Sequence, residues 1–153
     1  MSALCDIYIC EAVNVPALRF VQIFDCEFQY DVQKEYFGYL GVNIGRIKAV
    51  SIIVDLKKHG VKAFSVPVRY RDGSNLSIEE ALQLASRYAA DNGCSVVFDS
   101  SRANTTSPAF WLFVISEDPK GRSGGVVLVD RLDGHIWQAE EYDEYMYDFN
   151  NVF

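Results

Sequence analysis

The stretch SIEEALQLASRYAADNGCSVVF, residues 77–98, carries the clearest secondary-structure pattern in the chain. A capping box opens it, in which the Ser77 hydroxyl and the Glu80 carboxylate each pair with an amide that the first helical turn leaves unbonded. Asn-Gly ends the helix, and CSVVF (94–98) follows as a strand. Apolar residues recur at helical spacing and predict the buried stripe: Ile78, Ala81, Leu82, Ala85 and Tyr88.

Beyond this helix the chain has the pattern of consecutive strands. AFWLFVI (109–115) and VVLVDRL (126–132) are rich in β-branched and aromatic residues and predict strands on either side of a glycine-rich turn at 120–125. Asp-Gly directly after the second strand is the strongest hairpin pattern in the sequence, so HIWQA (135–139) is expected to pair back antiparallel.

Towards the N-terminus the patterns are shorter. Residues 4–10 alternate apolar and other positions and predict a first strand. Residues 17–30 are β-branched and aromatic with partial alternation and predict a second strand. Asp31 then offers an N-cap for a short helix that Gly41 stops.

The middle of the chain completes the prediction of the fold. Residues 45–60 have apolar residues at helical spacing and end in Lys-Lys-His-Gly, which favours a helix, although their isoleucines and valines also permit a strand. Residues 61–71 predict a strand that Pro67 confines to a sheet edge. We therefore expect a single α+β domain over residues 1–153, a mostly antiparallel sheet of about six strands with helices packed on one face.

The C-terminal stretch EEYDEYMYDF, residues 140–149, combines five carboxylates with four aromatic rings. Its apolar positions keep the register of one helical face, which predicts a helix docked on the core through Tyr142, Tyr145, Met146, Phe149, Val152 and Phe153. The remaining positions are expected to face outward and form a partner-binding surface: Glu140, Glu141, Asp143, Glu144, Tyr147 and Asp148.

The charges are unevenly spread along the chain. The net charge of −7 argues against nucleic acid as a ligand, since phosphate neutralisation needs a dominant basic face. Residues 45–71 are basic, whereas no Lys or Arg follows Arg131. The basic segment could face the acidic end within one chain, meet it in a homodimer, or leave the acidic end for a partner.

Residues 1–20 lack the basic region and uninterrupted apolar run of a secretory signal, and no run of 18 apolar residues occurs, so we expect a cytoplasmic protein that does not bind or cross a membrane.

The residue types that carry catalysis are few, and we expect no enzyme, no cofactor and no metal. His59 and His135 are the only histidines, one at the end of a predicted helix and one after the hairpin glycine. The glycine-rich stretch at 121–125 lacks the order of a phosphate-binding loop and connects two strands. Trp111 and Trp137 lie in predicted strands and are expected to pack in the core. Four cysteines show no metal-binding spacing and are expected to be reduced and mostly buried: Cys5, Cys10, Cys26 and Cys94.

The second half of the chain follows a recognisable order: the helix SIEEALQLASRYAADNG, the strand FWLFVI, a glycine-rich turn, the hairpin GGVVLVDRLDGHIW and the ending EEYDEYMYDF. This order resembles the small bacterial immunity proteins of the YrhB type, with their Trp-x-Phe strand, glycine, VDxxTG hairpin and acidic terminal helix. PepSY-type inhibitory domains share the helix and the hairpin. The resemblance covers residues 77–149, and the residues that match the family's motif are Trp111, Phe113, Gly125, Val129, Asp130 and Gly134. The sequence departs from the motif at Asp133, where the family has Thr.

The resemblance implies a cytoplasmic immunity protein that binds and neutralises a cognate toxin. An acidic, aromatic helix face is suited to the basic clefts of toxins that attack nucleic acid, because carboxylates imitate phosphates and tyrosines add rigid contact area. We therefore expect a non-enzymatic inhibitor of a basic protein toxin. The alternative is a small cystatin-like or nuclear-transport-factor-like ligand-binding domain or enzyme, with a pocket between sheet and helix.

Overall fold

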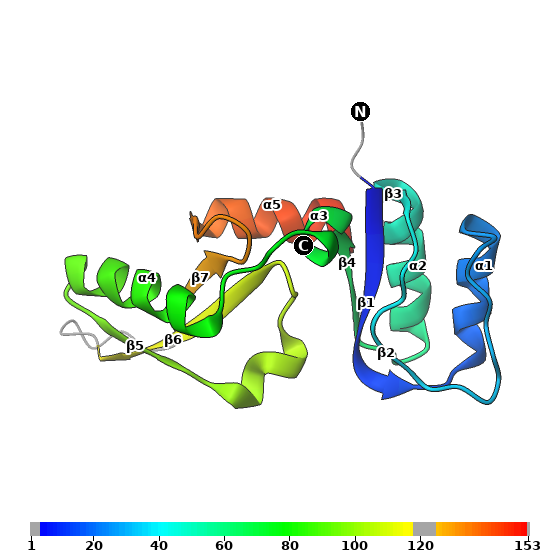
Figure 1. Cartoon of the computed structure of the whole chain (residues 1–153), viewed down its shortest axis with the longest axis horizontal. Coiled ribbons are helices and arrows are strands. Elements are labelled where there is room, and N and C mark those ends of the chain that lie inside the picture. Colours follow the sequence, from blue (N-terminus) through cyan, green and yellow to red (C-terminus); the bar gives the residue numbers. More distant parts are fainter. Residues whose placement is uncertain (1–3, 118–124, 153) are drawn as a thin grey trace. The chain divides into compact units, whose positions relative to one another are not determined.

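The computed structural model describes residues 4–117 and 125–152, apart from the side chains of residues 103, 104 and 117. The predicted turn at 120–125 therefore lies, except for Gly125, outside the described residues. The chain divides into two compact units, unit 1 formed by Met1–Asp72 with Glu140–Phe153 and unit 2 formed by Gly73–Ala139 (Figure 1). The expected single domain stays a prediction. No helix in the described part is both long and apolar enough to span a membrane.

Unit 1 is built around β1 (Leu4–Val13), which pairs antiparallel with three strands. These partners are β2 (Tyr36–Tyr39), β3 (Ile44–Gly45) and β4 (Ala63–Pro67). Alternate β1 side chains are fully buried on one face, and helix α2 (Arg46–Lys58) packs its apolar stripe on them. The buried residues of this interface are Cys5, Ile7, Ile9, Ala49, Ile52, Ile53 and Leu56. The predicted strand at 4–10 and the helix within 45–60 are confirmed.

The predictions for residues 17–30 and for the segment after Asp31 were wrong. The predicted strand at 17–30 is instead the 3-10 helix η1 (Pro16–Phe20) followed by the short helix α1 (Val21–Phe24). Proline in the first turn has its φ preset for a helix, and the segment buries residues three apart, Leu18 and Val21, while Ile23 is 72% exposed.

The predicted helix after Asp31 is the strand β2. The Asp31 carboxylate caps only a local turn, by accepting a hydrogen bond from the Gln33 amide at 2.9 Å. Tyr36 is buried and Phe37 exposed, as alternation in a strand requires. Gly38 takes a φ of +74°, which a helix does not accommodate.

The predicted strand at 61–71 is confirmed as far as Pro67 and wrong beyond it, because Val68–Asp72 forms helix α3. This helix brings Arg71 to Asp6, a fully buried β1 side chain, with Nη1 3.0 Å from Oδ2. Asp6 also accepts hydrogen bonds from the amides of Gly41 and Val42, so it fastens this loop to β1. Arg71 donates further to the Val42 carbonyl, Asn43 and Asp72. Its hydrogen bonds to the carboxylates of Asp72 and Asp6 raise the pKa of its guanidinium group. A buried acid with so many donors is a structural clamp.

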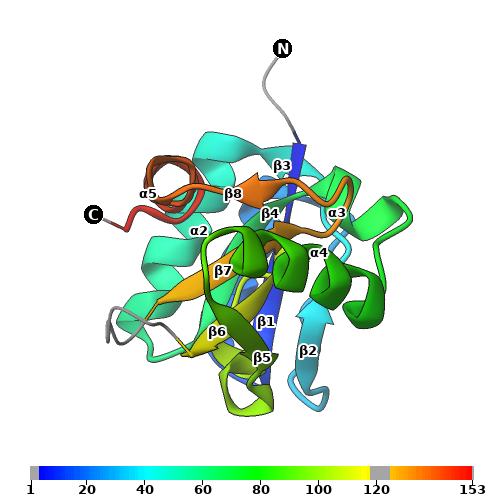
Figure 2. The ribbon, with the colours of Figure 1, turned by 90° about the vertical axis from the view of Figure 1, so that its left-hand side faces the viewer.

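Unit 2 is one helix on a four-stranded antiparallel sheet (Figure 2). Helix α4 (Ile78–Asp91) begins with the predicted capping box and ends at Asn92. The elements that follow along the chain are β5 (Ser95–Phe98), the 3-10 helix η2 (Ser100–Thr105), β6 (Phe110–Glu117), β7 (Val126–Asp130) and β8 (Ile136–Trp137), and the strands pair in sequence order.

Helix α4 contacts the sheet through small side chains. Ala81 and Ala85 pack on Phe113, Val127 and Val129. Of the predicted stripe, Tyr88 is 37% exposed and Ala89 is buried in the last turn instead.

The predicted hairpin is confirmed by the pairing of β7 with β8. Gly134 takes a φ of +77° and donates its amide hydrogen to the Asp130 carbonyl at 3.0 Å, while the Asp133 carboxylate accepts from the His135 amide. The α+β class and the antiparallel pairing are therefore confirmed, with the described strands arranged as two four-stranded sheets.

Candidate functional site: the outer face of the C-terminal helix

The predicted C-terminal helix is α5, Ala139–Asn150. Tyr145 and Met146 are buried, and Phe149 packs on the core of unit 1. The helix stops earlier than expected, so Val152 lies beyond it and is 38% exposed, while Phe153 is outside the described residues. Asn151 causes the stop, because it adopts a left-handed φ of 54°.

Two hydrogen bonds fasten α5 to the edge strand β4. The Tyr145 hydroxyl donates to the Ser65 carbonyl at 2.9 Å, and the Ser65 amide donates to Oδ1 of Asn150 at 2.8 Å. Ser65 pairs with Ile7 at a position where both its backbone groups point away from β1. The helix therefore occupies backbone groups that a further strand would otherwise use.

A third contact lies at the end of α5. Arg46, the first residue of α2, donates from Nη1 to the Asp148 carbonyl at 2.7 Å. A cation at this end of a helix is favourable, since the last carbonyls carry the negative end of the helix dipole. Ser65 and Asn150 were not singled out in the sequence, because a contact between residues 85 positions apart leaves no local pattern. Arg46 belongs to the basic segment for which a contact with the acidic end was one of the alternatives.

The side of α5 opposite this anchor carries the predicted partner-binding residues. Glu140, Asp143, Glu144 and Tyr147 follow the spacing i, i+3, i+4, i+7, so they share one face of the helix. The three acids are exposed, and Tyr147 is 54% exposed. Glu141 is exposed and Asp148 half-buried at the margins of this surface. We call the four central residues the outer face of α5.

The basic middle segment does not neutralise these acids through ion pairs. In the described ranges, ion pairs within 4.0 Å join Lys62 to Glu11 and Arg71 to Asp6 and Asp72, and none involves Glu140, Asp143, Glu144 or Asp148. Arg46 meets α5 at a backbone carbonyl. No ion pair in the described part of the chain therefore occupies the three carboxylates of the outer face.

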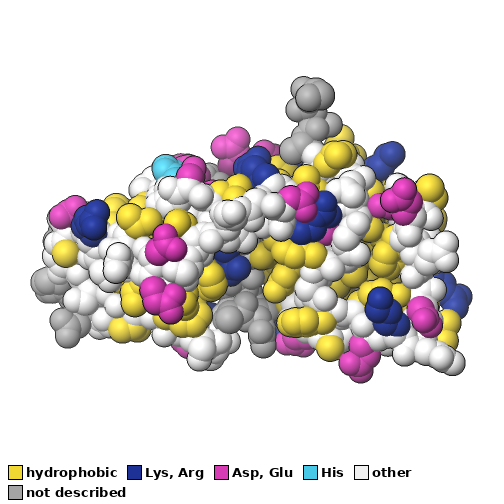
Figure 3. Space-filling model, in the orientation of Figure 1, with side chains coloured by type: hydrophobic (Ala, Val, Ile, Leu, Met, Phe, Trp, Pro, Cys, Tyr) yellow, Lys and Arg dark blue, Asp and Glu magenta, His cyan; other side chains and the backbone are white. Residues whose placement is uncertain are grey.

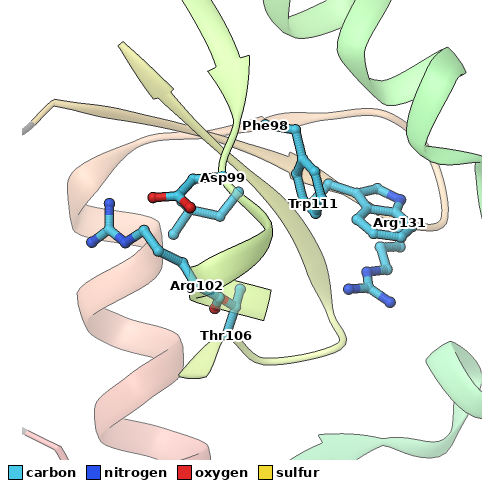
Figure 4. A pocket seen from close by; sticks show the side chains of 7 residues that line it. Phe98, Asp99, Arg102, Thr106, Trp111 and Arg131 are labelled. Atoms are coloured by element: carbon cyan, nitrogen blue, oxygen red, sulfur yellow. The ribbon is translucent and has the colours of Figure 1, made fainter. Parts of the chain in front are cut away.

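A small hollow in unit 2 surrounds Trp111, one of the residues behind the family resemblance (Figure 4). The Arg131 guanidinium lies 3.8 Å from the Trp111 ring centroid, and Phe98 meets the same ring edge-on at 6.3 Å. The indole N–H donates to the Leu76 carbonyl at 3.0 Å. The space enclosed is about 20 Å³, enough for about one water molecule. Trp111 therefore has a packing role, as expected from its strand.

The histidines and cysteines do not form a reactive group. His59 lies at the end of α2 with Nδ1 2.9 Å from the Asp55 carbonyl oxygen, and His135 lies in the β7–β8 turn. Burial raises the pKa of the Cys10 thiol to about 11 and raises that of Cys5, which keeps both thiols protonated near neutral pH. Cys26 is exposed and Cys94 half-buried. Among the described residues no three His, Cys, Asp or Glu side chains could hold a metal ion together.

Figure 3 shows one face of the molecule, on which the described Lys and Arg side chains lie among acidic and hydrophobic ones. The expectation that nucleic acid is not a ligand stays a prediction.

No protein-family model, curated protein or solved structure matches the chain. The resemblance to YrhB-type immunity proteins therefore stays an expectation from the sequence.

Proposed function

We propose that this chain is a non-enzymatic binding protein that neutralises a basic protein partner, of the toxin class, through the outer face of α5. One observation carries the proposal. The same helix that is hydrogen-bonded to β4 on one side presents Glu140, Asp143, Glu144 and Tyr147 on the other.

The anchor matters because rigid charges bind better than mobile ones. Two hydrogen bonds to Ser65 and the packing of Phe149 hold the helix before any partner arrives, so little conformational entropy is lost on binding. Residues 140 and 147 are separated along the helix axis by about 10 Å, which follows from a rise of about 1.5 Å per residue. A row of arginines or lysines on a partner helix or strand can meet carboxylates at that spacing.

Tyr147 gives the surface a second kind of contact. An exposed tyrosine beside carboxylates can stack on an arginine guanidinium group while the acids bind its N–H groups. Aromatic and arginine residues dominate the energetics of many protein interfaces. The partner is therefore expected to be rich in arginine, and the negative surface should accelerate its association at low salt.

The test needs a candidate partner, and the first to try is any secreted basic protein that proves to be encoded next to this chain's gene. The double variant Glu140→Lys/Glu144→Lys should lose protection of cells that express this partner, and its Kd should rise at least about 100-fold through lost attraction and new repulsion. Its matched control, Glu79→Lys/Asp91→Lys, makes the same charge change at exposed positions of α4. An equal loss of affinity in both variants would show that the effect comes from net charge alone. Unchanged affinity in both variants would refute the proposed surface.

A further inference from the structure

Unit 1 contains a second surface feature that the proposed function does not use. A hollow of about 390 Å³ lies along β2 and is lined by that strand and by the segment before it. Its lining includes Glu27, Phe28, Glu35, Tyr36 and Phe37. We call this space the β2 hollow. Its volume falls in the range of about 300–1,000 Å³ that is usual for ligand sites.

The hollow is held open by contacts of Tyr36. The Tyr36 hydroxyl accepts a hydrogen bond from the Asp31 amide at 2.8 Å and donates to the Gln29 carbonyl at 3.3 Å. Phe28 packs on the same ring, with the centroids 5.7 Å apart. The segment opposite β2 is thus fixed at two points to a buried side chain, and the space between them exists before a ligand arrives.

One long side of the hollow is the outer edge of β2. In the described strands β2 pairs with β1 alone. Gly38 pairs with Ile9, and the Leu40 amide donates to the Ile7 carbonyl at 2.9 Å, so β2 is paired along the edge that faces β1, and no described strand pairs with its other edge. Phe37 lies in this strand directly before Gly38. Its side chain is 64% exposed.

This edge differs from that of β4. Helix α5 occupies the outward backbone groups of Ser65, whereas a lined hollow lies beside Phe37. A strand edge that no described strand covers, beside a preformed space, suits an extended peptide, which supplies backbone groups of its own for pairing.

The charges around the hollow indicate which peptide fits. Glu27 and Glu35 are exposed, and in the described ranges no ion pair within 4.0 Å reaches either of them. The one cation of the lining, Lys34, has its ammonium 5.4 Å from the centroid of the Tyr36 ring. Carboxylates next to aromatic rings favour a positively charged side chain over a negative or neutral one.

We propose that the β2 hollow binds an extended segment of a partner protein that adds to β2 as a further strand and places an arginine or lysine between Glu27 and Glu35. This site goes beyond the proposed function, since it uses no residue of α5 and stands or falls separately from it.

The test is a titration of the isotope-labelled full chain with a synthetic peptide, followed by NMR. The probe is the acetylated and amidated hexapeptide Thr-Val-Arg-Val-Arg-Val. We expect saturable shifts of the amides of Phe37, Gly38 and Tyr39. A peptide with Glu in place of both Arg should bind at least about tenfold more weakly, because the rim carboxylates would repel it.

Two further peptides test backbone pairing without changing charge. Each is N-methylated at alternate residues, so that one version blocks the amides facing β2 and the other blocks the opposite edge. Strand addition predicts that only one version loses binding, by about tenfold or more. Equal affinity of both versions, or of the Arg and Glu peptides, would overturn the proposal.

Protein variants separate this site from α5. Glu27→Gln/Glu35→Gln should weaken binding of the Arg peptide about fivefold, as expected for two exposed ion pairs. Glu79→Gln/Asp91→Asn removes the same number of carboxylates from exposed positions of α4 and should leave that affinity unchanged. Shifts confined to α5 and abolished by Glu140→Gln/Glu144→Gln would refute the β2 site while supporting the outer face of α5. Absence of binding to millimolar peptide would refute the β2 site alone.

Discussion

Removing the Tyr145 hydroxyl tests whether α5 is held by β4. In Tyr145→Phe the Ser65 carbonyl loses its donor at a buried position, while the ring keeps its stacking on Phe149, whose centroid is 5.2 Å away. A neutral hydrogen bond of this kind contributes about 0.5–1.5 kcal/mol net, and a buried group left unbonded costs about 1–3 kcal/mol. We therefore expect a loss of about 1–2 kcal/mol in the free energy of unfolding.

Asn150→Ala examines the other half of the same anchor. It removes the acceptor of the Ser65 amide in a residue that is itself buried, so a loss of about 1–3 kcal/mol is expected. The two changes act on one residue of β4 and should be non-additive in a double-mutant cycle. The double variant should also expose the edge of β4, and we expect concentration-dependent self-association in sedimentation.

The assay is urea unfolding, with thermal unfolding as a second measure. A loss of 1 kcal/mol corresponds to about 2–4 °C in Tm for a chain of this size. Tyr88→Phe is the matched control, since it removes the same atom from a partly exposed ring of α4 and should change stability by less than about 0.5 kcal/mol. The reasoning would be refuted if Tyr145→Phe were no more destabilising than this control.

Three other outcomes are expected from the structure. Arg71→Met leaves the Asp6 carboxylate buried without its cation and should lower the free energy of unfolding, measured in urea, by about 3 kcal/mol. The control Arg87→Met, at an exposed position of α4, should lower it by less than about 0.5 kcal/mol. Similar losses in both variants would contradict the clamp. Burial raises the pKa of Cys10 in the folded chain to about 11, so the stabilising contribution of its thiol should be full below about pH 9 and lost as the pH rises through about 11. At pH 8 a thiol reagent should therefore label the exposed Cys26 long before the buried Cys10. Equal labelling rates would contradict this. If the chain is one cooperative domain, as its sequence predicts, fluorescence and circular dichroism should report a single coincident unfolding transition, and two separated transitions would assign separate stabilities to units 1 and 2.

Sequence patterns located the elements whose determinants are local. The capping box at Ser77, the Asp-Gly turn before His135 and the periodicity of α5 each act within a few residues. The two helices and the hairpin form where they were expected, although β8 is shorter than predicted and α5 ends at Asn150. The segment 17–30 was misjudged because its apolar residues fit a period of two as well as a period of three, and only burial of Leu18 and Val21 against β1 and α2 distinguishes them.

The candidate site was predictable only in part, because a local sequence pattern shows the faces of a helix but not its distant contacts. The amphipathic pattern of residues 140–149 indicates which side chains of α5 face outward, because that information is periodic. The pattern does not indicate that α5 is hydrogen-bonded to Ser65, because Ser65 lies 80 positions from Tyr145 and 85 from Asn150. Nor does a local pattern indicate that the buried Asp6 binds Arg71, which is 65 positions away. Long-range hydrogen bonds are fixed by the assembled sheet, and a single sequence has no pattern for them.

The anchor on Ser65 also links the stability of unit 1 to the proposed binding. The position of α5 depends in part on the pairing of β4 with β1, because the backbone of Ser65 makes two of the hydrogen bonds that hold the helix. A partner that binds the fixed helix must therefore stabilise unit 1, by about 2.7 kcal/mol at a concentration 100 times its Kd. Conversely, Asn150→Ala should weaken partner binding although Asn150 is buried beneath the helix and touches no partner. Such a loss, with the charge of the outer face unchanged, would show that a positioned helix, and not net charge alone, makes this surface a binding site.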